Sequence, residues 1–277
     1  MITSLQNARV KETLRLRKSS AARRESERFI IDGPREISMA IENGLQIETL
    51  FFQSDALNDA VDAEAESMPQ TVRSLAPEIQ CSVAEPVMQK LSYGQKSDDL
   101  VAVARTPTLN LEALSLPPNA LVLALDQTEK PGNIGACMRT ASACAVDAVV
   151  LVDPLCEVFN PNTIRASRGT VFTVPIAVCA FDDFCEFTRS HQLVVHCGRL
   201  DGALGVWDLQ LGPGTAVVVG NEASGLGNRW QQLDSSGFRI PMTRSTDSLN
   251  MSVSAAVTLY EAMRQRSDSL PNRPKSE

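Results

Sequence analysis

The second half of the chain contains five short runs of aliphatic residues, separated by polar loops. Most of these runs are apolar nearly throughout, as strands are when both faces of a parallel sheet are covered. Parallel strands need crossover connections, which are usually helices, so the pattern predicts a parallel α/β domain. The predicted strands are residues 121–126, 148–153, 193–197, 215–220 and 238–242.

Two segments of this half have the apolar spacing of helices. Residues 133–145 follow the first predicted strand, and Asn133 is a suitable N-cap. Residues 249–266 follow the last one, with Asp247 or Ser248 as the expected cap and two arginines at the carboxyl end. The apolar face of this last helix would contain Leu249, Val253, Val257, Tyr260 and Met263.

The first hundred residues predict a smaller α/β domain. Helices are expected at 10–18, 34–43 and 85–91, strands at 47–52, 81–84 and 100–105, and a short apolar run lies at 29–32. Residues 106–119 contain three prolines and little periodicity, which is typical of a linker. We therefore expect domains at 1–105 and 120–266, this linker between them, and a frayed tail at 267–277.

Several classes of protein are excluded by simple counts. No apolar stretch approaches the ~18 residues that span a bilayer, and the amino terminus is polar and basic, so we expect a soluble, cytoplasmic protein without membrane contact. The seven cysteines form no Cys-x-x-Cys pair, so neither a disulfide framework nor a zinc site is indicated. Of the two histidines, His191 and His196, the second lies in an apolar run and is expected to be structural.

Charge is distributed unevenly around a net value of −7. Residues 1–35 hold nine basic and four acidic side chains, whereas residues 36–105 hold four basic and twelve acidic ones. The basic end could be a solvated helix face. It could also be an arm that contacts phosphate groups, which draw on lysine and arginine.

Three polar loops follow predicted strands, where ligands bind in open parallel sheets. The first runs from Asp126 to Arg139 and leads into a helix. The second, Gly220-Asn-Glu-Ala-Ser-Gly-Leu-Gly227, combines glycines that permit close backbone approach with an acid, Glu222. The third, residues 240–252, leads into the last helix. None is a phosphate-binding or dinucleotide-binding fingerprint, and each alone could be a capped helix or a tight turn.

Together the three loops resemble the motifs of the SpoU/TrmH family of S-adenosylmethionine (AdoMet)-dependent RNA ribose 2′-O-methyltransferases, within the SPOUT class. The family's Asn-x-Gly-x-x-x-Arg motif matches Asn133-Ile-Gly-Ala-Cys-Met-Arg139, and its Gly-x-Glu-x-x-Gly motif matches Gly220-Asn-Glu-Ala-Ser-Gly225. Its Ile-Pro-Met and Ser-Leu-Asn-x-Ser sequences match residues 240–242 and 248–252, and Arg264-Gln-Arg266 ends the following helix as in the family.

The resemblance implies a deep trefoil knot in the second domain, through which the last segment threads. AdoMet would bind there in a bent form, and two copies would pair through helices 133–145 and 249–266 as a homodimer. Some apolar surface of the last helix would then be shared between chains. The residues expected to hold AdoMet are Cys197, Gly198, Gly220, Asn221, Ile240 and Leu249.

The resemblance also assigns catalytic roles. Arg139 would act on the 2′-hydroxyl and its neighbouring phosphate, and no metal is required. A guanidinium stays protonated, with a pKa above ~12, which makes it a poor general base. We therefore expect Arg139 to clamp the phosphate and stabilise the developing alkoxide. The residues expected to shape this pocket are Asn133, Glu222, Ser248 and Asn250.

The amino-terminal segment resembles the substrate-binding domain of the family's ribosomal-RNA-type members, a small α/β sandwich related to kink-turn-binding ribosomal proteins. The resemblance rests on the basic opening, Phe29-Ile-Ile-Asp-Gly-Pro-Arg35 and Leu100-Val-Ala-Val-Ala104, although the family usually has Glu-Gly at Asp32-Gly33. The RNA contacts expected here are Arg9, Lys11, Arg23, Arg24 and Arg28, with Arg165 and Arg168 nearer the catalytic face.

The resemblance favours 23S ribosomal RNA as the substrate, with a tRNA as the alternative. A catalytically silent RNA-binding or ribosome-assembly protein is a second hypothesis, but such a protein has no need of Asn133, Arg139, Glu222 and Asn250 together. A third hypothesis is an enzyme that methylates a base, and the Ser-Leu-Asn-x-Ser motif favours ribose instead.

Overall fold

The structure is a computed structural model of the 277-residue chain, and it describes residues 1–53, 69–92, 100–212, 214–221, 225–233, 235–243 and 248–266. It forms two compact units. Unit 1 comprises Met1–Thr108 and Glu157–Thr173, and unit 2 comprises Leu109–Cys156 and Val174–Glu277. The chain therefore returns to unit 1 once, between two strands of unit 2, at a place where the sequence predicted an uninterrupted second domain.

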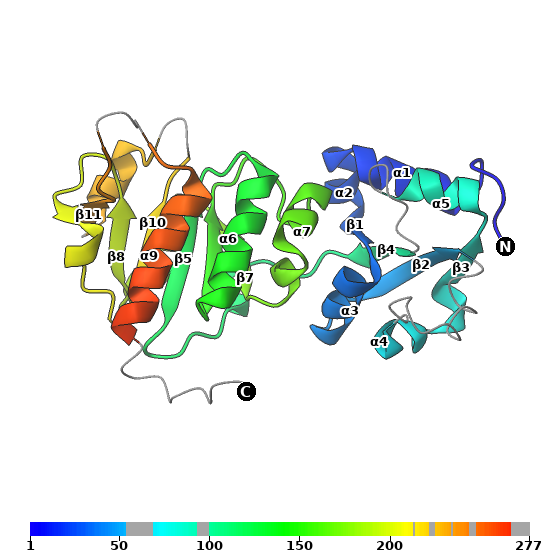
Figure 1. Ribbon diagram of the computed structural model, residues 1–277, viewed down its shortest axis with the longest axis horizontal. Coiled ribbons are helices and arrows are strands. Elements are labelled where there is room, and N and C mark those ends of the chain that lie inside the picture. Colours follow the sequence, from blue (N-terminus) through cyan, green and yellow to red (C-terminus); the bar gives the residue numbers. More distant parts are fainter. Residues whose placement is uncertain are drawn as a thin grey trace. The chain divides into compact units, whose positions relative to one another are not determined.

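Unit 1 contains a mixed four-stranded sheet in the order β1-β4-β2-β3. Strand β4 is antiparallel to β1 and β2, and β2 is parallel to β3. Helices α1 and α5 cover one face, where Val10, Leu16 and Leu91 are buried, and α3 and α7 cover the other (Figure 1). The strands are β1 (Arg28–Asp32), β2 (Ile47–Gln53), β3 (Gln80–Val83) and β4 (Leu100–Arg105). The helices are α1 (Ala8–Lys18), α2 (Ser20–Ser26), α3 (Pro34–Glu42), α4 (Gln70–Arg73), α5 (Glu85–Leu91) and α7 (Pro161–Ser167).

The returning segment is held in unit 1 by an aromatic stack and an ion pair. The Phe29 ring of β1 stacks on Phe159, with ring centroids 4.4 Å apart, and Phe172 packs beside both. Arg23, which is 7% exposed, pairs with Glu157. Aromatic stacking and a buried ion pair both require close fit, so this segment is part of the unit 1 core.

Unit 2 contains a seven-stranded sheet in the order β7-β6-β5-β10-β8-β11-β9, and every paired strand in its described part is parallel. Helices α6 and α9 lie side by side on one face, and α8 packs on the other (Figure 1). The strands are β5 (Leu121–Asp126), β6 (Ala148–Val152), β7 (Ile176–Cys179), β8 (Val194–Gly198), β9 (Leu204–Gly205), β10 (Thr215–Val219) and β11 (Ser235–Arg239). The helices are α6 (Pro131–Ala143), α8 (Phe181–Ser190) and α9 (Met251–Arg266).

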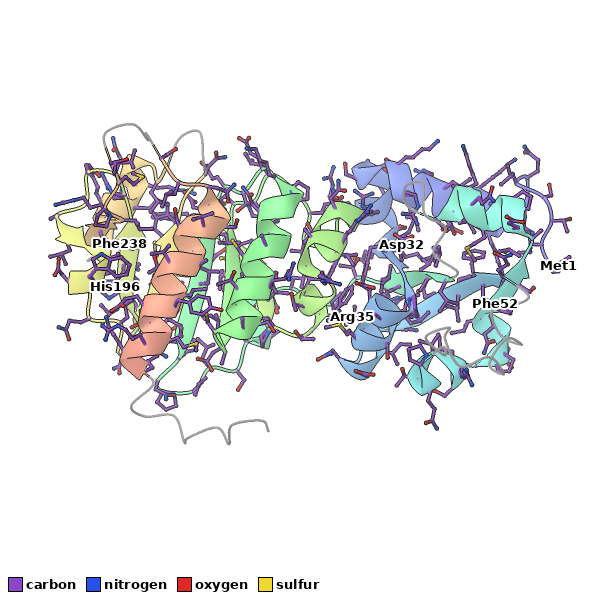
Figure 2. All side chains as sticks on the ribbon, in the orientation of Figure 1. Met1, Asp32, Arg35, Phe52, His196 and Phe238 are labelled. Atoms are coloured by element: carbon purple, nitrogen blue, oxygen red, sulfur yellow. The ribbon has the colours of Figure 1, made fainter. Side chains whose placement is uncertain are left out.

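Side chains of the central strands alternate between two apolar layers, as the period of a strand requires. Val122, Ala124 and Val218 point toward α8 and the 3₁₀ segment η6, with Phe184 and Trp230 fully buried beside them. His196 is 3% exposed in β8 and its Nε2 contacts the carbonyl of Gln210, and Figure 2 shows it near Phe238. The 3₁₀ segments are η2 (Pro77–Ile79), η3 (Leu111–Ala113), η4 (Thr170–Phe172), η5 (Val206–Asp208) and η6 (Asn228–Gln232). In the described part of the chain, no helix is both long and apolar enough to span a bilayer.

The predicted strand at 238–242 was wrong in position, because β11 ends at Arg239. Pro241 has no amide hydrogen to donate to a sheet, so residues 240–243 leave the strand and form a loop. The predicted N-cap Asn133 was also wrong. Helix α6 begins at Pro131, a residue favoured in the first helical turn, after the cap residue Lys130.

The apolar face predicted for the last helix points outward at two positions. Val253 is 45% exposed and Tyr260 is 54% exposed, whereas Ala255, Leu259 and Ala262 of α9 are fully buried. Small residues allow α9 to pack closely on α6 and β10. Val253 and Tyr260 are therefore left on the outer side of the helix.

Candidate functional site

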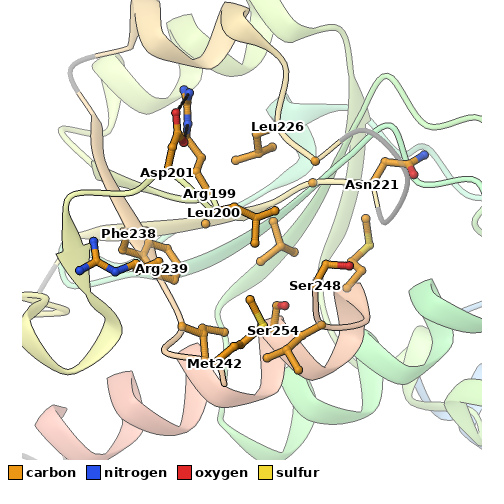
Figure 3. A pocket seen from close by; sticks show the side chains of 17 residues that line it. Arg199, Leu200, Asp201, Asn221, Leu226, Phe238, Arg239, Met242, Ser248 and Ser254 are labelled. Carbon is orange, nitrogen blue, oxygen red and sulfur yellow. Dashed lines mark hydrogen bonds and ion pairs between the residues drawn. The ribbon is translucent and has the colours of Figure 1, made fainter. Parts of the chain in front are cut away.

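A pocket of about 540 Å³ lies at the carboxyl ends of β8, β10 and β11 and at the start of α9 (Figure 3). This is the edge at which open parallel sheets bind ligands, and the volume is typical of small-molecule sites. Apolar side chains form much of its wall, among them Val219, Leu226, Phe238, Met242 and Met251. The charged residues among its described lining are Arg199, Asp201 and Arg239.

Glycines bring the loops of the pocket into contact. A Cβ added at Gly220 would lie 2.5 Å from the carbonyl carbon of Gly225, and one added at Gly202 would lie 2.3 Å from that of Phe238. Real Cβ atoms do not approach backbone this closely, so both positions require glycine. Gly220 is thereby held against Gly225, and the turn after β8 is held against Phe238.

Five of the six residues predicted to hold the cofactor line this pocket: Gly198, Gly220, Asn221, Ile240 and Leu249. Cys197 does not. It is fully buried, and its side chain packs in the apolar layer beneath α8 because neighbouring strand residues face opposite sides. The structure therefore argues against a direct contact from the Cys197 thiol, whose position could only contribute backbone.

Asn133 and Asn250, 117 residues apart in the sequence, meet at the edge of the site. The Asn250 Nδ2 donates to Asn133 Oδ1 at 3.2 Å. The Asn250 Oδ1 accepts from the backbone N–H and the hydroxyl of Ser252, so Asn250 also caps the start of α9. Thus Asn250, rather than Ser248, provides the cap, and Asp247 lies outside the described residues.

The remaining predicted catalytic residues are placed differently. Ser248 lines the pocket, and Glu222 lies outside the described residues. Arg139 is exposed on α6 and is not among the described residues that line the pocket. Because a helix has 3.6 residues per turn, Arg139 and Asn133 lie on different sides of α6. The structure thus brings Asn133, Asn250 and Ser248 together within one chain, without Arg139.

The basic residues of the amino terminus fall into two groups: arginines held by acidic partners, and residues exposed to solvent. Arg17, Arg23 and Arg28 are largely occupied: Arg17 pairs with Asp32, Arg23 pairs with Glu157 and donates to the carbonyl of Leu16, and Arg28 pairs with Glu12 and Glu48. The structure therefore argues against Arg23 and Arg28 as RNA contacts. The exposed basic residues of this region are Arg9, Lys11, Arg15, Lys18, Arg24 and Arg35.

Arg165 and Arg168 lie in unit 1 rather than in unit 2, where the sequence placed them. Arg165 is in the last turn of α7, and Arg168 follows it with a φ of 51°. Both are exposed, and the turn after Arg168 lies against α3, since a Cβ at Gly169 would meet Met39 at 2.7 Å.

Sequence reasoning missed the side chains that complete the pocket wall. Arg199, Leu200 and Asp201 follow β8 directly, and Arg199 makes two hydrogen bonds of 2.9 Å to Asp201 (Figure 3). The Asp201 side chain raises the pKa of Arg199, and Arg199 in turn lowers that of Asp201. The sequence feature that could have identified these residues is their position directly after a predicted strand, where open parallel sheets bind ligands.

Comparison with known proteins bears directly on this arrangement. Residues 120–260 match the model of the SpoU rRNA methylase family. The chain belongs to the SpoU rRNA methylase family. Residues 7–102 match a second model, the MRM3-like substrate-binding domain. The resemblance drawn from the three motifs is therefore confirmed, as is that of the amino-terminal segment to a substrate-binding domain.

Several relatives match nearly the whole chain. The 23S rRNA (uridine(2479)-2′-O)-methyltransferase of Streptomyces viridochromogenes is 29% identical over 274 residues, 96% of this chain and 92% of that one. A crystal structure of an RNA 2′-O ribose methyltransferase is 34% identical, with a TM-score of 0.79 over 96% of this chain and 98% of that one. The SpoU methyltransferase AviRb from S. viridochromogenes, crystallised with AdoMet, is 27% identical, with a TM-score of 0.84 over 94% and 98%.

Proposed function

We propose that this SpoU family member transfers the methyl group of AdoMet to a ribose 2′-hydroxyl of 23S ribosomal RNA. The observation that carries the proposal is the convergence of the family's motif loops on one pocket, beside the hydrogen-bonded pair Asn133 and Asn250. Relatives that match almost the full length, from Streptomyces viridochromogenes and Bacillus subtilis, are named as 23S rRNA ribose 2′-O-methyltransferases. The alternative acceptor is a tRNA.

The pocket suits AdoMet in shape and polarity. Gly220 lies directly against the Gly225 backbone, where a side chain at position 220 would not fit, and the backbone of both glycines lines the pocket, where it can approach an adenosine closely. Phe238, Ile240 and Leu249 offer apolar surface for its ring. When bound, AdoMet supplies an electrophilic methyl group: the new bond joins that carbon to the ribose oxygen, its bond to sulfur breaks, and the hydroxyl proton leaves to water.

The chain's own residues orient the acceptor. Ser248 lines the pocket, and Asn250, two residues later, is hydrogen-bonded to Asn133. These three residues are proposed to border the entry of the 2′-hydroxyl, together with Glu222. Arg139 is proposed to bind the neighbouring phosphate and stabilise the alkoxide as it forms. A guanidinium suits this role because it holds a phosphate with two parallel hydrogen bonds while remaining charged.

A homodimer is proposed, and the placement of Arg139 and α9 supports it. Val253 and Tyr260 leave apolar surface on the outer side of α9, which lies beside α6. Pairing two copies through these helices would cover that surface and allow Arg139 of one copy to approach the pocket of the other. Light scattering that reports the mass of one chain would contradict this pairing.

A trefoil knot is proposed for unit 2. Strand β10 lies between β5 and β8, although β8 precedes it in the chain. After β11, which lies between β8 and the edge strand β9, the chain returns to α9 beside α6. This route supports the threading of the chain end that a knot requires. The similarity of this chain to SpoU methyltransferases, such as AviRb with a TM-score of 0.84, also supports the proposed knot.

The proposed activity is tested by transfer of labelled methyl groups from AdoMet to unmodified 23S rRNA and, separately, to unmodified tRNA. We expect label in the 23S rRNA and none in the tRNA. Label only in tRNA would favour the alternative acceptor. No label in either RNA, with AdoMet still bound, would contradict the proposed activity and favour the catalytically silent RNA-binding protein.

RNA contacts are proposed for the exposed face of α1, on the four-stranded sandwich that resembles kink-turn-binding proteins. Lys11 and Lys18 are exposed there, and Arg9 and Arg24 flank them. Replacing Lys11 and Lys18 together by alanine should weaken RNA binding and flatten the plot of log affinity against log salt by roughly 1.5, because each phosphate contact releases a counterion.

The matched control is Arg73→Ala on α4, which packs with α3, away from α1. It should leave the salt dependence unchanged. Equal slopes for the double variant and the unchanged protein, measured by filter binding over a range of salt, would refute the α1 contact. Arg23→Ala is expected to lower thermal stability instead, since it leaves Glu157 without its nearest partner.

A further inference from the structure

Asp126 is a buried carboxylate at the carboxyl end of β5, and none of the roles proposed above uses it. Asp126 is 1% exposed, and its Oδ2 accepts a hydrogen bond of 2.8 Å from Trp230 Nε1. Its Oδ1 accepts from Arg229 Nη2. Burial raises the pKa of the Asp126 carboxyl, while the hydrogen bonds from Trp230 and Arg229 oppose that rise. A buried carboxylate is tolerated only with such partners, so this network is tightly constrained.

Arg229 connects the segment η6 to three other elements. Its Nη1 donates to Asp153, which follows β6, and its guanidinium lies over the Phe181 ring at the start of α8, 4.6 Å from the centroid. Trp230 is fully buried and packs edge-on against Phe181 and Phe184. Two consecutive residues therefore attach η6 to the ends of β5 and β6 and to α8.

The described residues between β10 and η6 form one wall of the pocket. One end of this segment is attached to Gln127 and the other end to the neighbouring Asp126. At the first end, Asn221 Nδ2 donates to the Gln127 carbonyl at 3.0 Å. At the second end, Arg229 and Trp230 bind Asp126. Between these two points, Gly225 and Leu226 line the pocket, and the Gly225 N–H donates to the Asn221 carbonyl. A shift at either attachment would therefore move this wall.

We propose that Arg229, Trp230 and Asp126 form a network that positions the pocket wall at Asn221, Gly225 and Leu226 for AdoMet, so that affinity for the cofactor depends on Arg229. This inference rests on the proposed function in taking AdoMet as the ligand. Arg229 is not among the described residues that line the pocket, so it is a positioning residue rather than a catalytic one.

The chain has two tryptophans, so the fluorescence of Trp230 can report on the network once the other tryptophan is replaced. Trp207, on η5, is 58% exposed and does not line the pocket, whereas Trp230 is buried in the network. The variant Trp207→Phe leaves Trp230 as the single tryptophan. Its fluorescence is expected to change as AdoMet is added and to saturate with the same dissociation constant that calorimetry measures.

Substitutions are then compared in the Trp207→Phe background. Arg229→Met should weaken AdoMet binding about tenfold, which corresponds to about 1.4 kcal/mol. Arg229→Lys should weaken it less, because an ammonium keeps the positive charge and can bind one carboxylate, although it lacks the fork that reaches two. Asp153→Asn is the matched control: it keeps the Arg229 contact with Asp126 and should bind AdoMet within about twofold of the background protein. Circular dichroism establishes that each variant is folded, and Arg229→Lys carries the test if Arg229→Met does not fold.

The turnover number at saturating AdoMet separates positioning from general damage. It should stay within about threefold of normal in Arg229→Lys while the KM for AdoMet rises, because Asn133 and Asn250 are untouched. A folded Arg229→Met or Arg229→Lys variant with unchanged AdoMet affinity would overturn the inference. Trp230 fluorescence that does not change at saturating AdoMet would also overturn it. If Trp207→Phe itself bound no AdoMet, the proposed function would be contradicted instead.

Discussion

Replacing Arg139 by lysine should lower the rate of methyl transfer at least about 100-fold while AdoMet binding stays unchanged. Lysine keeps the positive charge but loses the two parallel hydrogen bonds that hold a phosphate and the developing alkoxide, and loss of one such donor typically costs this much. Arg139 is not among the described residues that line the pocket, so its replacement should not change the affinity for AdoMet. Single-turnover kinetics with 23S rRNA measures the rate, and calorimetry measures the AdoMet affinity.

Arg189→Lys is the matched control for this experiment, because Arg189 is also an exposed arginine of a unit 2 helix, α8, on the opposite face of the sheet. It should methylate normally. A near-normal rate of methyl transfer for Arg139→Lys would contradict the phosphate clamp. The positive charge at position 139 would then be sufficient for the reaction. A rate that falls together with AdoMet affinity would place Arg139 at the cofactor instead.

The largest expected effect on stability comes from Arg266, the last residue of α9. Its guanidinium donates to the backbone carbonyls of Leu211, Gly212, Asn119 and Ala120, and so attaches the end of α9 to the segments before β5 and β10. Arg266→Met keeps the apolar stem but loses all four hydrogen bonds. The free energy of unfolding should fall by about 2 kcal/mol, which is roughly 4–8 °C in Tm for a chain of this size.

Arg189→Met serves as the control, since an exposed arginine away from such contacts should change stability by less than about 0.5 kcal/mol. Urea unfolding followed by circular dichroism measures both variants. Equal midpoints for the two would show that the end of α9 is not held by Arg266. The neighbouring Gln265, which bonds Leu209 and Leu211, would then be sufficient.

The inner strands β5, β6, β8 and β10 of unit 2 could be predicted because their composition is unambiguous. Residues 121–126 are buried on both faces and coincide with β5. In contrast, β7 and α8 were missed, although Phe184, Cys185, Phe187 and Thr188 have helical spacing. The strand before that helix is an edge strand of four residues, only partly buried, and too short for its pattern to stand out.

The site was predicted from motifs, but its limits follow from long-range contacts that no local pattern contains. Arg23 reads as part of a basic arm, yet its partner Glu157 is 134 residues away. Cys197 sits next to Gly198 in the sequence, yet strand alternation turns its side chain into the core. The Asp126 network likewise could not be predicted, because Arg229 and Trp230 lie more than 100 residues from Asp126 in the sequence.

The central claim, methylation of a ribose, is tested most directly by the chemical identity of the methylated nucleoside. 23S rRNA labelled by this protein and AdoMet is digested to nucleosides and analysed by mass spectrometry. The account predicts a single 2′-O-methylnucleoside, with the methyl group retained on the ribose fragment and an alkali-resistant linkage at that position. A methyl group retained on the base fragment would contradict the account.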